Sequence, residues 1–170
     1  MQLIKEKIFI PLEMKRSFYV IPDEFKTNLA VGMDGGPSEI IDTESPKTEH
    51  HGRGYKVPNG GIYSTPSDLA KFMISNLGYL PLLKTESLEI MQTETGPESN
   101  KYGLGFFIFR NDQINIIGHN GHLLGYTSQF AFEKESKFGI ILMRNYTWGA
   151  TDLDKASFNL LNKLKQLKKQ

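Results

Sequence analysis

The sequence predicts an α+β fold, in which an antiparallel sheet carries a C-terminal helix on one face and shorter helices on the other. Two observations lead to this prediction. Strand-like runs at 102–109, 113–118, 126–133 and 138–143 follow one another with short connections, which is typical of an antiparallel meander. Segments before and after these runs have apolar residues at helical spacing, and they supply the helices that would cover the sheet.

Composition limits the kind of protein this is. The 170 residues are 39% hydrophobic with a formal charge of +1, which predicts a single globular unit over 1–170. The near-balanced charge favours neither nucleic acid nor an anionic membrane as a partner. The absence of cysteine excludes disulfides, thiol nucleophiles and thiolate metal sites. The first residues are too few and too charged for a signal peptide, and no apolar run is long enough to span a bilayer, so we expect any export signal outside this sequence.

The first half of the chain is expected to hold three helices and a long loop. Residues 1–8 are typical of the last turns of an amphipathic helix that ends before Pro11. The segment 33–61 has no period and many glycines and prolines, so we expect an irregular loop that is functional or mobile. Thr65, followed by proline and, three residues later, by Asp68, predicts the start of a helix that ends near Gly78. A shorter helix is expected over 86–92.

The C-terminal third ends in a strand and a helix. The continuous apolar run at 138–143 predicts a central strand that is covered on both faces. Thr151 and Asp154 have the spacing of a capping box for the helix that follows. Its predicted inner face consists of Leu153, Ala156, Leu160, Leu161, Leu164 and Leu167. The lysines near its end suit the helix dipole and a solvated surface better than a nucleic-acid site.

The stretch His119-Asn120-Gly121, followed by Gly125 and Tyr126, is the best candidate for function. We expect it to be the end of one strand, a glycine-rich turn and the start of the next strand. Gly121 lacks a side chain, so a ligand backbone can approach closely there. Histidine is the residue type whose ordinary side-chain pKa lies near neutrality, and His119 supplies one here. Together these features predict a binding edge for a substrate backbone.

Four segments, in this order, resemble the serine β-lactamase-like hydrolases, the group of class C β-lactamases, D-Ala-D-Ala carboxypeptidases, penicillin-binding proteins and esterases. They are Ile8-Phe9-Ile10-Pro11-Leu12-Glu13-Met14, the run 58–69 that begins Pro-Asn-Gly-Gly, Tyr102-Gly103-Leu104-Gly105-Phe106, and Gly118-His119-Asn120-Gly121. The resemblance covers almost the whole chain but only about the later half of the family's domain. It implies a β-lactamase/transpeptidase-like fold and no cofactor or metal. Glu13 departs from the glycine usual in the first segment.

The resemblance also implies roles for particular residues. His119 takes the place of the lysine in the family's Lys-Thr-Gly motif, Asn120 that of the substrate-binding threonine, and Gly121 that of the glycine. The backbone N–H of His122 would be one oxyanion-hole donor. The family's nucleophile motif Ser-x-x-Lys and its Tyr-x-Asn motif occur nowhere in this sequence. Ser64 and Ser67 are better explained as residues at a helix start, and Ser128 has no base near it in sequence.

The implied reaction is hydrolysis or transfer at an amide, lactam or ester carbonyl through an acyl-serine, with a peptidase or esterase favoured over a dedicated β-lactamase. Acyl transfer needs an activated hydroxyl as well as oxyanion donors. We therefore expect this chain alone to be inactive, and to require a missing N-terminal half or to self-associate. The resemblance favours a bacterial protein at the cell envelope or outside the cytoplasm.

Three alternatives remain open. His119 and His122 with His50 and His51 have the composition of a metal cluster, although no carboxylates stand at ligand spacing. His119 is also explained as a histidine whose hydrogen bonds are satisfied by neighbouring strands. Finally, the groove beside Gly121 suits a non-catalytic module that binds a peptide without cleaving it.

Overall fold

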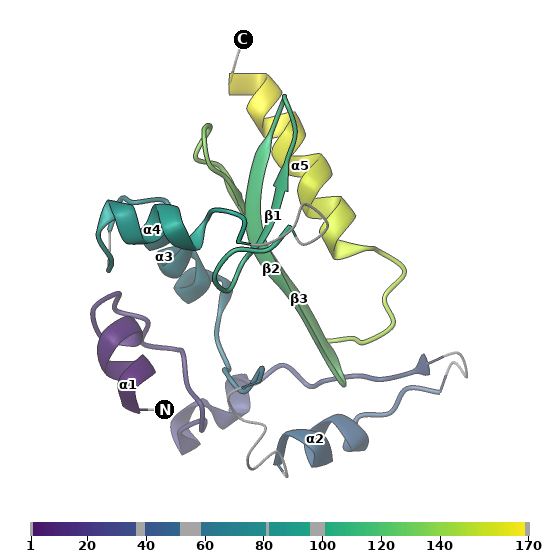
Figure 1. Cartoon of the computed structure of the whole chain (residues 1–170). Coiled ribbons are helices and arrows are strands. Elements are labelled where there is room, and N and C mark those ends of the chain that lie inside the picture. The colour runs from purple at the N-terminus through teal and green to yellow at the C-terminus, as the bar shows by residue number, and fades with distance from the viewer. Residues whose placement is uncertain (1, 37–39, 52–58, 81, 96–100, 169–170) are drawn as a thin grey trace.

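The core of the protein is an antiparallel sheet of four strands, β1 (Phe107–Arg110), β2 (Asn115–Leu123), β3 (Tyr126–Glu133) and β4 (Gly139–Arg144), in the order β1-β2-β3-β4 (Figure 1). The computed structural model describes residues 2–36, 40–51, 59–80, 82–95 and 101–168. Short connections join each strand to the next, so the predicted meander is confirmed. The predicted α+β class is also confirmed, because helices lie on both sides of this sheet (Figure 1).

Strand β2 is longer than its partner β1. The β1–β2 register begins with Arg110 opposite Asn115 and ends with Phe107 opposite Gly118, whereas β3 pairs with β2 as far as Leu123. Residues 119–123 therefore have a strand partner on one side only among the described residues, and we call this stretch the open edge of β2. The predicted turn at 119–121 is wrong: the strand continues, and the turn comes at Gly125, which has a φ of +83°.

Two hydrophobic clusters hold helices against the two faces of the sheet. On one face, Met73 of α3 (Pro66–Asn76) packs with Phe106, Ile117 and Phe132, and Met91 of α4 (Thr85–Met91) joins them. On the other face, Leu161 of α5 (Leu153–Lys168) packs with Ile114, Ile116 and Ala131. Strand β4 contacts both α3 and α5, so its predicted cover is confirmed. Its predicted central position is wrong, because β4 is the last strand in the sheet order.

The N-terminal segment packs beside α3. Helix α1 (Gln2–Ile4) continues into a π-helical turn over Lys5–Phe9, and Phe9, Leu12 and Met14 form a third cluster with Phe72. The predicted cap of α3 at Thr65 is confirmed, since the Thr65 hydroxyl accepts a hydrogen bond from the Asp68 backbone at 3.2 Å. The Asp68 carboxylate accepts from the Arg16 backbone and the Ser17 hydroxyl, so it holds the N-terminal segment against α3. The predicted short helix over 86–92 corresponds to α4.

The segment 33–61 differs from the irregular loop that we expected. It contains helix α2 (Glu44–His51), and the Asp42 carboxylate accepts hydrogen bonds from the backbone N–H groups of Glu44 and Ser45 at its start. A one-sided apolar pattern is missing from this helix, which explains why periodicity did not indicate it. Residues 37–39 and 52–58 of the expected loop lie outside the described residues.

Helix α5 begins and faces the sheet differently from the prediction. Asp152, not Thr151, caps it, because its carboxylate accepts a hydrogen bond of 3.0 Å from the Lys155 backbone. The fully buried positions are Ser157 and Leu161, and Lys165 is only 8% exposed. These three residues are spaced by four, so they form one stripe along the helix. Two of the predicted inner residues, Leu160 and Leu167, are instead exposed.

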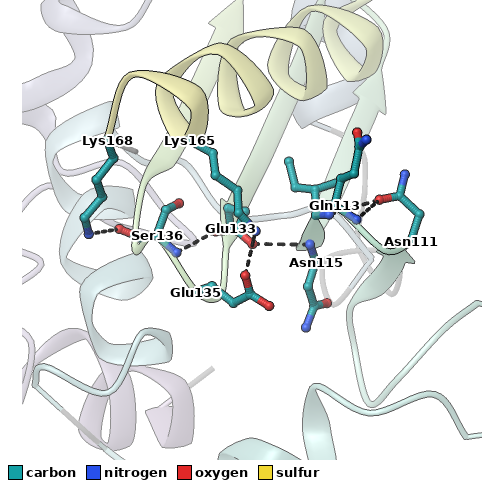
Figure 2. A network of polar contacts seen from close by, with 9 residues as sticks. Asn111, Gln113, Asn115, Glu133, Glu135, Ser136, Lys165 and Lys168 are labelled. Atoms are coloured by element: carbon teal, nitrogen blue, oxygen red, sulfur yellow. Dashed lines mark hydrogen bonds and ion pairs between the residues drawn. The ribbon is translucent and has the colours of Figure 1, made fainter. Parts of the chain in front are cut away.

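A network of polar contacts fastens the end of α5 to the β3–β4 turn (Figure 2). The Lys165 ammonium donates to Glu133 at 3.0 Å and to Glu135 at 2.7 Å. Glu133 also accepts from the backbones of Asn115 and Ser136. Burial raises the pKa of Glu133, but hydrogen bonds from Ser136, Lys165 and Asn115 outweigh it and lower this pKa to about 2. Burial lowers the pKa of Lys165, and the two carboxylates outweigh that effect and raise it. Both groups therefore stay charged at neutral pH.

Candidate active site

The open edge of β2 carries all four residues that the sequence singled out. His119 is the first residue of β2 beyond the end of the β1 ladder, and its side chain is exposed. Asn120, Gly121 and His122 follow it opposite Gln129, Ser128 and Thr127 of β3. Because side chains alternate along a strand, His119 and Gly121 lie on one face of the sheet, and Asn120 and His122 lie on the face that carries α5.

Both nitrogens of the His119 ring have hydrogen-bond partners. Nδ1 lies 2.6 Å from the backbone carbonyl oxygen of Asn120, and Nε2 lies 2.6 Å from the hydroxyl of Tyr102. A carbonyl oxygen only accepts, so the proton of the neutral ring is assigned to Nδ1. Nε2 then accepts from the Tyr102 hydroxyl. The Tyr102 and His119 rings also meet edge to face, with 5.8 Å between centroids and an interplanar angle of 84°.

Tyr102 reaches His119 from the tight turn that precedes β1. Its backbone oxygen accepts from Thr95, and the next residue, Gly103, donates to the Phe106 carbonyl at 2.8 Å. A Cβ atom at Gly103 would lie 2.2 Å from the carbonyl oxygen of Met91, so only glycine lets the turn pack against the end of α4. Tyr102 was predicted only as part of a family motif, and its contact with His119 was not predicted. Nothing in the local pattern indicated that the two residues would meet.

Asn120 points toward α5. Its side-chain amide donates to the carboxylate of Asp154 in the first turn of that helix, at 2.8 Å. The Gln129 amide, which lies opposite Asn120, forms a hydrogen bond with Ser157 of the same helix. The start of α5 is thus fastened to the strand that carries His119. The oxygen of the Asn120 amide remains the atom of this side chain that can accept from a ligand.

Gly121 lies against a serine. A Cβ atom built at Gly121 would come within 2.6 Å of the Ser128 hydroxyl on the neighbouring strand. The hydrogen bonds of the His119 ring go to Tyr102 and Asn120, so this imidazole does not activate Ser128. The open edge therefore offers backbone groups on the side away from β3 and two histidines, His119 and His122, without a serine nucleophile paired to a base.

A metal site or an enclosed cavity would be another kind of functional site. Within the described ranges, three or more His, Cys, Asp or Glu residues nowhere gather in a way that could hold a metal ion. The side chains of His50 and His51 lie outside the described residues. A cavity of about 160 Å³ lies between α3, α4 and β3, where Leu77, Leu88, Gln92 and Phe132 line it, so it is separate from His119. Of the helices described, none combines the length and apolar character needed to cross a bilayer.

Comparisons with known proteins agree on a family. The beta-lactamase family model matches residues 1–164. The chain is 27% identical to Beta-lactamase-like protein 4 of Dictyostelium discoideum, an alignment that covers 81% of this chain and 26% of the relative. It is 32% identical to Beta-lactamase-like protein 2 of the same organism, over 81% of this chain and 25% of the relative. The chain thus spans about a quarter of the length of these curated relatives.

Solved structures share the fold. The octameric penicillin-binding protein homologue from Pyrococcus abyssi superposes with a TM-score of 0.74 and 22% identity, covering 96% of this chain and 37% of that one. The D-amino acid amidase from Ochrobactrum anthropi SV3 superposes with a TM-score of 0.69 and 22% identity, covering 99% and 50%. The match of the family model over nearly the whole sequence, with the fold that these structures share, places the chain in the beta-lactamase family.

Proposed function

We propose that this chain supplies the substrate-binding edge and the histidine of a serine-hydrolase site that acts on amide, lactam or ester carbonyls through an acyl-serine. The observation that carries the proposal is the position of His119, exposed at the first residue of the open edge of β2, with its ring held by Tyr102 and Asn120. Membership of the beta-lactamase family supports a serine hydrolase.

The open edge suits an extended substrate. Unpaired backbone N–H and C=O groups at a sheet edge bind a peptide-like chain as an added strand. His119 would then stand beside the bound carbonyl and contribute electrostatically and in proton transfer, while the backbone N–H of His122 is proposed as an oxyanion donor. Asn120 is proposed to hydrogen-bond the substrate through its side-chain oxygen, with its nitrogen held by Asp154.

The nucleophile must come from another polypeptide segment. Ser-x-x-Lys and Tyr-x-Asn are absent from this sequence, and Ser128 is not paired with His119. Loss of the nucleophile from such a site leaves roughly a thousandfold rate enhancement from oxyanion and binding terms. One oxyanion donor is expected to leave with the serine, so this chain alone is proposed to be inactive. We propose a segment that carries Ser-x-x-Lys as its catalytic partner, and a second copy of the chain as its partner in self-association when that segment is absent.

Amides are the favoured substrate class. The fold neighbours include a D-amino acid amidase and a D-stereospecific amidohydrolase, and the His-x-Gly form of the third motif favours a peptidase or esterase over a dedicated β-lactamase. A second candidate function rests on the same edge: a module that binds a peptide without cleaving it, which needs the open edge of β2 but no nucleophile.

The test combines activity with binding. The purified chain, a His119→Ala variant and a Lys163→Ala control on the exposed side of α5 are incubated with a chromogenic β-lactam, a short-chain ester and a D-Ala-D-Ala peptide. No turnover is expected from any of the three proteins alone. Addition of an N-terminal segment with Ser-x-x-Lys from a family member should restore turnover with the wild-type and control chains but not with His119→Ala.

Each other result has a clear meaning. An acyl adduct on the chain alone, detected by mass spectrometry, would reveal a nucleophile within it and contradict the proposal. Restored turnover that His119→Ala leaves intact would remove His119 from the site. Peptide binding without turnover, even with the added segment, would favour the non-catalytic module.

A further inference from the structure

We propose that Tyr102 is the positioning residue of His119: its hydroxyl covers Nε2, while the Asn120 carbonyl keeps the proton of the neutral ring on Nδ1. The inference rests on the proposed function only in that His119 is taken as the working group of the site. The observation behind it is the 2.6 Å contact between the Tyr102 hydroxyl and Nε2, together with the 2.6 Å contact between Nδ1 and the Asn120 carbonyl.

The two contacts select one tautomer. Which nitrogen of a neutral imidazole holds the proton is set by the hydrogen bond that the other nitrogen makes. The Asn120 carbonyl requires a proton on Nδ1, since it cannot donate. The Tyr102 hydroxyl then donates to the lone pair of Nε2. Without that hydroxyl, Nε2 loses its hydrogen bond, while the Asn120 carbonyl still holds the proton on Nδ1.

Two ring contacts fix the orientation of the His119 imidazole. Tyr102 meets the imidazole edge to face at 5.8 Å, and Phe107 borders it with 6.4 Å between centroids and a 38° tilt. Tyr102 is itself held, because its backbone pairs with Phe107 and with Thr95. The hydroxyl therefore meets Nε2 from a fixed support.

This arrangement changes what an incoming group meets. Nε2 has a single lone pair, and Tyr102 occupies it. A substrate or nucleophile that approaches His119 must displace the Tyr102 hydroxyl or hydrogen-bond to that hydroxyl in place of the ring. Tyr102 therefore controls access to the basic nitrogen of His119, a role separate from holding the turn in place.

The first experiment reads the tautomer directly. Nitrogen-15 NMR of the imidazoles is recorded on the chain alone, at a pH well above the ordinary imidazole pKa, with the His119 signals assigned from the His119→Ala variant. The wild type should have its proton on Nδ1, and Tyr102→Phe should keep that tautomer but shift the Nε2 signal, because this nitrogen loses the hydrogen bond from the hydroxyl. Tyr126→Phe is the matched control, because it removes a hydroxyl that donates to the Ala30 carbonyl at 2.8 Å and does not contact His119.

The second experiment measures access to Nε2. Diethyl pyrocarbonate modifies unprotonated imidazole nitrogens, and peptide mapping gives the rate at His119. Tyr102→Phe should react several-fold faster than wild type, and Tyr126→Phe at the wild-type rate. An Nε2-protonated wild type, an unchanged Nε2 signal in Tyr102→Phe, or equal modification rates would each overturn the inference.

These readouts are independent of turnover. If the added Ser-x-x-Lys segment restores no activity, the proposed function fails while the tautomer and modification data still decide the role of Tyr102. The wild-type tautomer alone is sufficient to contradict the inference, so the test does not depend on the folding of Tyr102→Phe.

Discussion

Lys165 of α5 forms an ion pair of 3.0 Å with Glu133 of β3, and neither side chain is open to solvent. Glu133 is completely buried, and its remaining lone pairs accept from two backbone N–H groups. A buried carboxylate is stable only when its charge is paired and hydrogen-bonded. This pair therefore fixes how α5 lies on the sheet, and through Asp154 at the other end of the helix it supports the strand that carries His119.

Replacing Lys165 should destabilise the fold strongly. Lys165→Met leaves Glu133 buried without its cation, and the free energy of unfolding should fall by about 3–5 kcal/mol. Chemical denaturation monitored by circular dichroism measures the change. Lys163→Met, on the exposed side of the same helix, should change stability by less than about 0.5 kcal/mol. Equal effects of the two substitutions would mean that the ion pair is not structurally important.

Removing both charges should be milder than removing one. Glu133→Gln combined with Lys165→Met leaves no unpaired buried charge, and replacement of a buried ion pair by neutral groups is often close to neutral. The double variant should recover at least about half of the stability lost in Lys165→Met, a coupling that a double-mutant cycle measures. Additive losses would argue against a direct interaction between the two side chains.

Stability should fall in acid because of Glu133. Its pKa is lowered from 4.5 to about 2 in the folded state, so this carboxylate stabilises the fold above pH 4.5, and that contribution is lost as the pH falls toward 2. The shift corresponds to roughly 3 kcal/mol as an upper bound. The pKa of Lys165 is raised, so its contribution is lost only at alkaline pH. Denaturation at several acidic pH values should show the gap between wild type and Glu133→Gln closing as pH falls; a constant gap would contradict this origin.

Glu13 occupies a backbone conformation that favours glycine. Its φ is +52°, and a side chain in this left-handed region costs about 1–2 kcal/mol. Glu13→Gly should stabilise the chain by about 0.5–1 kcal/mol, because the extra entropy of glycine in the unfolded state offsets part of the gain. The Glu13 carbonyl would keep its hydrogen bond from Lys71. Thermal denaturation is the measurement, with Glu13→Ala as the control that removes the carboxylate but keeps the strain.

The elements predicted well from the sequence were those with local causes. The Thr65 cap, the strand Tyr126–Glu133 and the meander follow from hydrogen bonds and alternation within short stretches. The departure of Glu13 from the family's glycine was visible in the sequence, and its positive φ gives the physical reason why glycine is usual there.

The parts that were not predicted depend on contacts between distant residues. The inner stripe of α5 includes Ser157 and Lys165, which an apolar pattern assigns to solvent. They are buried because Gln129 and Glu133 on β3 provide polar partners. Prediction of the candidate site from the sequence has the same limit. Composition and motif identified His119, but its ring is held by Tyr102, seventeen residues earlier, through a turn whose path the sequence did not indicate.

The outer edge of β4 should pair with another chain. Sheet edges are normally protected by charged residues, proline or bulges. Residues 139–143 contain no charged residue and no proline, and the Met143 side chain is 45% exposed. The guanidinium of Arg144 donates hydrogen bonds to Thr127 and Thr151, so its charge is held away from the edge. In the described part of the chain, β4 pairs with β3 alone. An unprotected apolar edge of this kind is expected to associate with a second copy when no other strand is supplied.

Analytical ultracentrifugation tests this expectation over a wide range of concentrations. The wild-type chain should sediment as a dimer or larger species whose share grows with concentration. Met143→Lys places a charge at the β4 edge and should shift the chain toward monomer without loss of helix content, because this side chain is not part of the buried clusters. Leu3→Lys is the control, since Leu3 is 64% exposed on α1 and belongs to no strand. A wild-type chain that sediments as a monomer at every concentration would contradict pairing at β4. Association that Met143→Lys and Leu3→Lys weaken equally would point to a nonspecific apolar surface instead.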